Sequence, residues 1–128
     1  MSLVYYNLDI IQGSRFSAQL FATNADGTAV NLTGYNVRGV IKYNFGTGTA
    51  LTTLSPSINT TSVDPTHGGT YTAASGVIDV SVSAPVTAGL PVGIGVYDIE
   101  MYSGPEGNET DVRKLLDGRV RIHPEVTR

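Results

Sequence analysis

Residues 93–104 read GIGVYDIEMYSG, and this stretch decides the fold class. Apolar and polar side chains alternate along it, as in a β-strand with one buried face. We expect Tyr97, Ile99 and Met101 to face inward and Asp98, Glu100 and Tyr102 to face outward. Asp98, like Asp79 in the alternating stretch at 76–84, is therefore interpreted as a solvated residue of a strand face and not as part of an acid–base pair.

The same period of two recurs on both sides of this stretch. The inward sets that it predicts are Phe16, Ala18 and Leu20; Val37, Ile41 and Tyr43; Ile78, Val80 and Val82; and Val120 and Ile122. A first strand is expected within residues 3–12, one helical turn at 84–90, and a tight turn at Asp26-Gly27. Asp117-Gly118 is compatible either with a hairpin turn or with a strand that continues through a bulge at the glycine.

These patterns predict an all-β protein: one antiparallel β-sandwich, immunoglobulin-like in layout, with about seven to eight strands. The 128 residues are enough for a single domain, followed by a short extended tail over 124–128. Residues 45–75 break the alternation. This segment is expected to hold one short strand around 50–54 and otherwise to serve as an interface rather than as part of the core.

Composition excludes several classes of function. The chain has no cysteine, which excludes disulfides, thiolate catalysis and cysteine-ligated metal sites. Its net charge of −3 argues against a nucleic-acid partner. No apolar stretch is long enough for a membrane span and no basic leader is visible, so we expect a protein that is cytosolic when made and has no membrane partner.

The candidates for chemistry are few. Asp64 and His67 are spaced to share a metal ion, but they supply too few ligands, and the alternative is a loop capped by Asp64. No Gly-x-Ser-x-Gly elbow or phosphate loop is present. We therefore expect no enzymatic activity, no cofactor and no bound metal.

Aromatic residues outside the strand patterns leave two alternatives open. Tyr5, Tyr6, Phe45 and Tyr71 lie near the start of the chain or in the loose middle segment. They are either local packing residues or contact residues for a partner protein.

The order of several motifs resembles one protein family. IIQGSRF (10–16), DGTAVNLTGY (26–35) with Arg38, VYDIE (96–100) and LDGRVRIHPEVTR (116–128) are similar to the scaffold motifs of small structural proteins of tailed bacteriophages and of the N-terminal domains of phage baseplate upper proteins. The resemblance covers nearly the whole chain and is weakest over residues 45–75.

The resemblance implies a non-enzymatic structural protein of the virion, in the tail, baseplate or neck. It would bind other virion proteins, including copies of itself in a symmetric ring or lattice. A capsid decoration protein is the first alternative, and a carbohydrate-binding or host-surface-binding module that uses exposed Tyr71 and Tyr102 is the second.

The resemblance also suggests a use for the end of the chain. Pro124 lacks a backbone donor and should direct the tail away from the last strand, so that Val126 and Arg128 can contact a neighbouring subunit.

Overall fold

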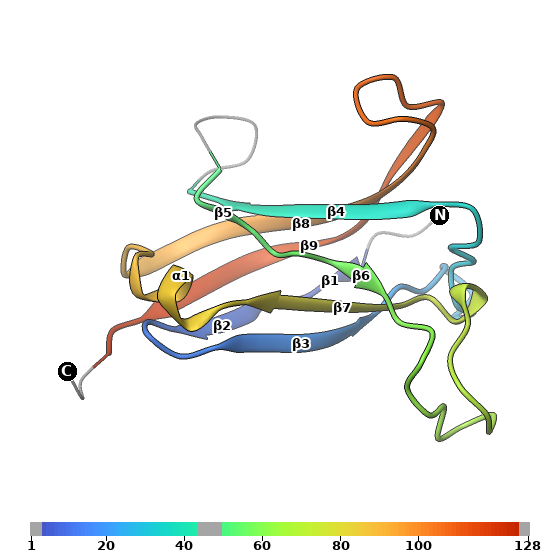
Figure 1. The fold of residues 1–128 in the computed structure, drawn as a ribbon, viewed down its shortest axis with the longest axis horizontal. Helices are drawn as coiled ribbons and strands as arrows, with labels where there is room; N and C mark the ends of the chain where they lie inside the picture. The colour runs from blue at the N-terminus through green and yellow to red at the C-terminus, as the bar shows by residue number, and fades with distance from the viewer. Residues whose placement is uncertain (1–3, 44–49, 126–128) are drawn as a thin grey trace.

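The computed structural model describes residues 4–43 and 50–125, and it forms two packed β-sheets (Figure 1). The larger sheet contains β1 (Val4–Tyr5), β2 (Leu8–Ile11), β4 (Asn36–Lys42), β5 (Thr52–Thr53), β8 (Gly93–Ser103) and β9 (Asp111–His123). The smaller sheet contains β3 (Phe16–Phe21), β6 (Ser57–Ile58) and β7 (Val77–Val82). A 3-10 turn, η1 (Ala73–Ser75), precedes β7, and the expected helical turn, α1 (Ala84–Ala88), follows it. The structure confirms a two-sheet, mostly β protein.

The first and last strands of the larger sheet run parallel to each other. β1 and β2 pair in succession with β9, and the order continues through β8 and β4 to β5. The other strand pairs in both sheets are antiparallel. The prediction of an antiparallel sandwich is therefore wrong at this edge, where the expected first strand is also divided at residues 6–7.

The chain passes from the larger sheet to the smaller one between β5 and β6. Leu54 lies at the crossing: its N–H donates to Gly39 O on β4 at 3.0 Å, and its carbonyl accepts from Ser81 N–H on β7 at 2.9 Å. Ser55 follows with φ of 47°, a left-handed conformation that turns the chain toward β7. β5 lies inside the predicted strand at 50–54, whereas β6 was not predicted.

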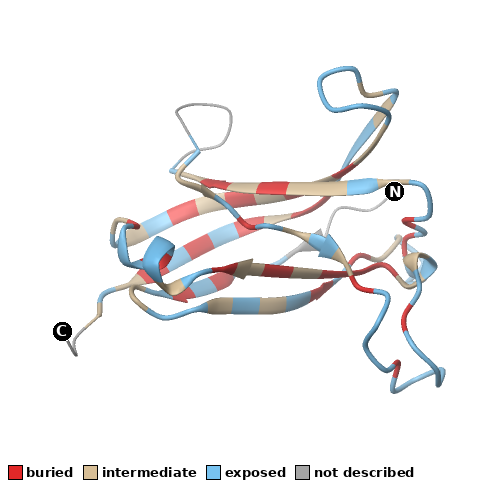
Figure 2. Ribbon diagram, in the orientation of Figure 1, coloured by how far each residue is buried: buried red, intermediate tan, exposed pale blue. Residues whose placement is uncertain are grey.

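Alternation along the strands places the core between the two sheets (Figure 2). The predicted inward residues Leu20, Ile41, Ile78, Val80, Val82, Tyr97, Ile99, Met101, Val120 and Ile122 are buried, and Phe16, Ala18 and Val37 pack against them. Tyr43 is the exception. It is 52% exposed because β4 ends one residue before it, so its prediction as a core residue is wrong.

Residues 50–75 contribute more to the core than expected. Leu54 is fully buried, Tyr71 is buried, and Leu51 and Ile58 pack against the core. The prediction that the whole segment lies outside the core is therefore wrong for these residues. The exposed part is the loop at 60–70, in which all residues except Asp64 are solvent-exposed.

β9 continues through Asp117-Gly118, so no hairpin turn forms there. The bulge lies elsewhere: Ile99 faces Leu116 and Glu100 faces Lys114, which leaves Leu115 as the extra residue. Both Leu115 and Leu116 are buried as a result. Gly118 has a different role, because a Cβ there would overlap the carbonyl oxygen of Tyr6.

Within the described ranges, 4–43 and 50–125, no helix has the length and apolar character that crossing a membrane requires.

Candidate functional site

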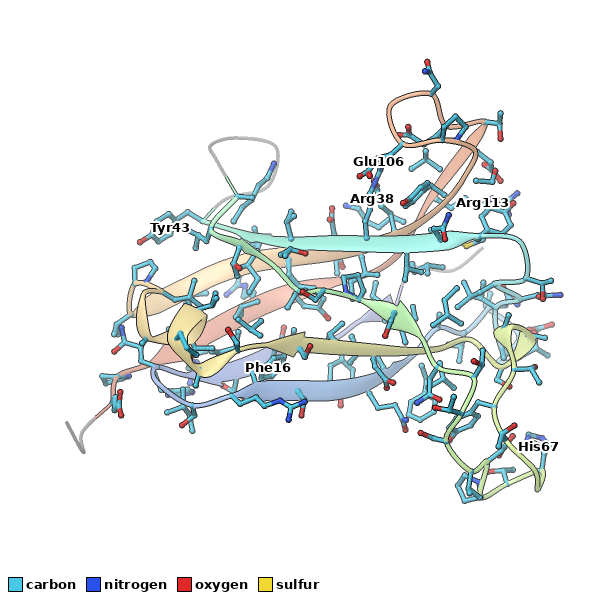
Figure 3. The ribbon with its side chains drawn as sticks, in the orientation of Figure 1. Phe16, Arg38, Tyr43, His67, Glu106 and Arg113 are labelled. Atoms are coloured by element: carbon cyan, nitrogen blue, oxygen red, sulfur yellow. The ribbon has the colours of Figure 1, made fainter. Side chains whose placement is uncertain are left out.

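The outer face of the larger sheet carries a network of charged side chains centred on Arg38. The Arg38 guanidinium binds Glu100 on β8 through Nε and Glu109 through Nη2, the latter at 3.1 Å. It also lies 4.6 Å from the centre of the Tyr102 ring, a cation–π contact. In Figure 3, Arg38 points from β4 toward the loop that carries Glu106. Arg38 thus joins β4 to β8 and to the loop between β8 and β9.

A second part of this network lies where that loop enters β9. The Tyr35 hydroxyl donates to Asp111 Oδ2 at 2.7 Å, and Arg113 Nε donates to the same oxygen at 3.1 Å. The hydrogen bond from Tyr35 lowers the pKa of Asp111, and the same bond raises the pKa of Tyr35. The bond from Arg38 likewise lowers the pKa of Glu109. These hydrogen bonds hold the side chains of the loop and of β4 in place relative to one another.

Asp64 closes the exposed loop, as the capping alternative predicted. Its Oδ1 accepts the backbone N–H groups of Thr66 at 2.9 Å and His67 at 3.1 Å, and its Oδ2 lies 3.1 Å from His67 Nδ1. The backbone N–H of His67 is the main reason that the pKa of Asp64 is lowered. The described residues contain no group of three or more potential metal ligands. Figure 3 shows His67 at the far end of this loop, well away from Arg38.

A shallow cleft of about 660 Å³ separates this loop from the end of β3. Phe21 and Tyr71 contribute its aromatic wall, with ring centres 6.4 Å apart in an edge-to-face arrangement. Thr28, Thr66 and His67 line its polar side. Tyr71 is therefore buried, in an edge-to-face pair with Phe21, instead of presenting its ring to solvent.

The predicted contact residues do not converge on one surface in the described structure. Tyr6 is 54% exposed at the parallel edge of the larger sheet, whereas Tyr71 is buried beside the smaller one. Tyr5 belongs to β1 and pairs with Asp117, but its side chain is outside the described part. Phe45, Val126 and Arg128 also lie outside the described residues.

The aromatic pair suggested for carbohydrate binding is not assembled. Tyr71 is buried, so the expectation that it is exposed is wrong. Tyr102 lies on β8 of the other sheet and stacks with Arg38. The two rings therefore cannot form one exposed aromatic platform.

Comparison with known proteins adds no relative. No protein-family model matches this chain, and no curated protein matches its sequence. Its surfaces therefore carry the argument about function.

Among those surfaces, the strand edges differ in how well they are protected. β5 and β6 each contain two residues, and β2 carries the charged residue Asp9. β3 has six residues, none of them charged or proline, and pairs on one side only, with β7. Long uncharged edges are the ones that accept a further strand. The alternation of apolar and polar residues predicted the strand β3. Its position at the edge of the sheet depends on strand order, which the alternation does not reveal.

Proposed function

We propose that this chain is a non-enzymatic structural component of a tailed-bacteriophage virion, in the tail, baseplate or neck, that binds neighbouring virion proteins. Its two sheets would serve as an immunoglobulin-like scaffold, and its edges and the tail at 124–128 would make the contacts. The proposal concerns assembly because the described polar groups hold one another and do not converge on a space for a substrate.

The observation that carries the proposal is that the motifs of the resemblance meet one another in space. Arg38, which follows the motif DGTAVNLTGY, pairs with Glu100 of VYDIE. Tyr97 of the same motif donates its hydroxyl to Tyr6 O at 2.6 Å, beside Gly118 of the last motif. Residues far apart in sequence thus depend on one another, as expected if the motifs belong to one scaffold.

NLTGY has a similar scaffold role at one end of the sandwich. Leu32 is fully buried, and Tyr35 packs against the core and donates its backbone N–H to Leu32 O at 3.0 Å. Gly34 provides the positive φ of 81° that closes this turn. The motif therefore stabilises the turn at this end of the sandwich. Contacts with partner proteins would be made by other surfaces.

The test is the location of this chain in purified phage particles. Quantitative mass spectrometry of intact particles should detect it at a fixed ratio to the major capsid protein, and a particle reconstruction should place its density at the tail, baseplate or neck. Absence of the chain from purified, infectious particles would overturn the proposal.

Copy number separates the proposal from the capsid-decoration alternative. A tail, baseplate or neck ring contains few copies, whereas a decoration protein approaches the abundance of the major capsid protein. Binding of the isolated domain to host glycans would instead support the module that recognises a host surface. Since Tyr71 is buried beside the smaller sheet and Tyr102 lies on β8 of the larger one, such binding would have to use another site, for example the cleft beside His67.

A further inference from the structure

We propose that β3 is a self-association edge, where a second copy of this chain adds its own β3 in antiparallel orientation to form a sheet that is continuous across two subunits. The inference rests on the proposed function in one respect, namely that copies of the chain assemble with one another. It specifies in addition which surface is used, that the partner is a second copy, and which residues of the two β3 strands lie opposite each other.

The hydrogen-bond pattern of the smaller sheet leaves one side of β3 open. Val77 O accepts from Asn59 N–H, and Ser81 N–H donates to Leu54 O, each at 2.9 Å, so these β7 residues bond toward the β6 side. The intervening β7 residues therefore bond toward β3, because the direction alternates along a strand. By the observed register, the β3 residues whose main-chain groups turn away from β7 are Ser17, Gln19 and Phe21.

No other strand in the described structure pairs with this side, although the Tyr71 ring contacts Phe21. Within 4–43 and 50–125, no hydrogen bond from outside the β3–β7 pairing reaches those three residues. The side chains of Ser17 and Gln19 are exposed, and Phe21 is 51% exposed. In Figure 1, β3 is the outermost strand of its layer, with β7 on one side only. The edge therefore presents unpaired donors and acceptors together with an exposed aromatic ring.

The strand is self-complementary when two copies are related by a twofold axis. Face alternation requires inward residues to oppose inward residues. With Ala18 opposite Ala18 of the second copy, Phe16 opposes Leu20 and the apolar interior continues across the axis. On the outer face, Ser17 opposes Gln19 and Arg15 opposes Phe21, so each guanidinium can cover an exposed ring. No like charges face each other in this register.

A second copy fits this edge better than an unrelated charged peptide. β3 itself has no charge for such a peptide to recognise, whereas its main-chain groups and matched faces suit an identical strand. Arg15 directly precedes β3 and Phe21 is its last residue. The twofold axis therefore places Arg15 of each copy beside Phe21 of the other copy.

The first test compares Gln19→Lys with Asn108→Lys by sedimentation velocity over a concentration series. The lysine introduced on β3 would lie diagonally across from Arg15 of the second copy and from that copy's own introduced lysine. These like charges should weaken the dimer about tenfold or more in Kd. Asn108 lies in the exposed β8–β9 loop, where the substitution makes the same change of charge away from β3. Its variant should associate like the wild type, and both variants should keep the wild-type circular dichroism spectrum.

The second test reads the register directly. The chain has no cysteine, so Ala18→Cys introduces a single thiol that lies opposite its own copy. Cβ atoms in such a pair are about 4.5–5.5 Å apart, close enough for a disulfide after small adjustments. Mild oxidation should yield a covalent dimer from Ala18→Cys but not from Asn108→Cys.

The outcomes separate this inference from the proposed function. A wild-type chain that stays monomeric at every concentration, or a dimer that Gln19→Lys leaves unchanged and Ala18→Cys does not trap, would overturn the β3 pairing. Neither result removes the chain from the particle, which the copy-number measurement tests independently. Loss of the chain from particles with intact β3 dimers would overturn the virion role alone.

Discussion

Replacing Gly118 by alanine should destabilise the protein strongly, although alanine is ordinarily the better residue in a strand. A glycine-to-alanine change stabilises by about 0.5–1 kcal/mol when the new methyl group has room. Here the Cβ would overlap Tyr6 O and lie 2.7 Å from Tyr6 C, both backbone atoms. The chain at Tyr6 must therefore move away from β9.

The size of the effect follows from what that movement breaks. Tyr6 N–H donates to Asp117 O at 2.8 Å, and Tyr6 O accepts from the Tyr97 hydroxyl at 2.6 Å. Each bond contributes about 1 kcal/mol, and overpacking adds about 1–3 kcal/mol. A loss of about 3–5 kcal/mol is a large part of a typical stability of about 5–15 kcal/mol, and it should lower Tm by about 10 °C or more.

The assay is thermal and urea unfolding followed by circular dichroism, with Gly89→Ala as the matched control. A Cβ at Gly89 would lie 3.6 Å from Val86 O, an ordinary contact, and the residue has φ of −89°. Gly89→Ala should therefore change the free energy of unfolding little. If Gly118→Ala melts at or above the wild-type temperature, the reasoning about the close approach of Tyr6 to β9 is wrong.

Three further results are expected. Leu54→Ala should cost about 2–5 kcal/mol in urea unfolding because Leu54 is fully buried where the chain changes sheets; a cost below about 1 kcal/mol would contradict its place in the core. The lowered pKa of Asp64 means that its carboxylate stabilises the fold above its ordinary value of 3.8 and that this contribution is lost as pH falls below it. Asp64→Asn should therefore flatten the acid side of the stability–pH curve, and an unchanged curve would show that the loop does not depend on that charge. Removal of residues 124–128 should leave the melting temperature nearly unchanged but reduce incorporation into particles, since Pro124 is exposed beyond β9; a lower Tm with normal incorporation would show that the tail belongs to the fold.

Much of the fold could be predicted because one face of each main strand is apolar. Alternation identified the buried faces around Leu20, Ile41, Val80, Tyr97 and Val120, all of which are buried. It could not reveal strand direction, since parallel and antiparallel strands share the same period of two. The parallel pairing of β2 with β9 was therefore missed.

The remaining errors also have physical causes. Tyr43 continues the alternation of β4, but the strand ends at Lys42, so the pattern extends one residue too far. Leu54 sits in a hydroxyl-rich stretch without any period, and its burial depends on contacts with both sheets. The pairing of Arg38 with Glu100 joins residues 62 positions apart, which only the strand register brings together.

The parallel edge between β2 and β9 determines when this protein can fold during its synthesis. The backbone N–H of Arg119 donates to Asn7 Oδ1 across 112 positions of the chain, so β1 and β2 have no partner in their sheet until β9 has left the ribosome. Contacts over such sequence distances carry a large loop-closure cost and slow folding. Until β9 arrives, Leu8 and Ile10 remain uncovered, and the nascent chain is most vulnerable to aggregation during that interval.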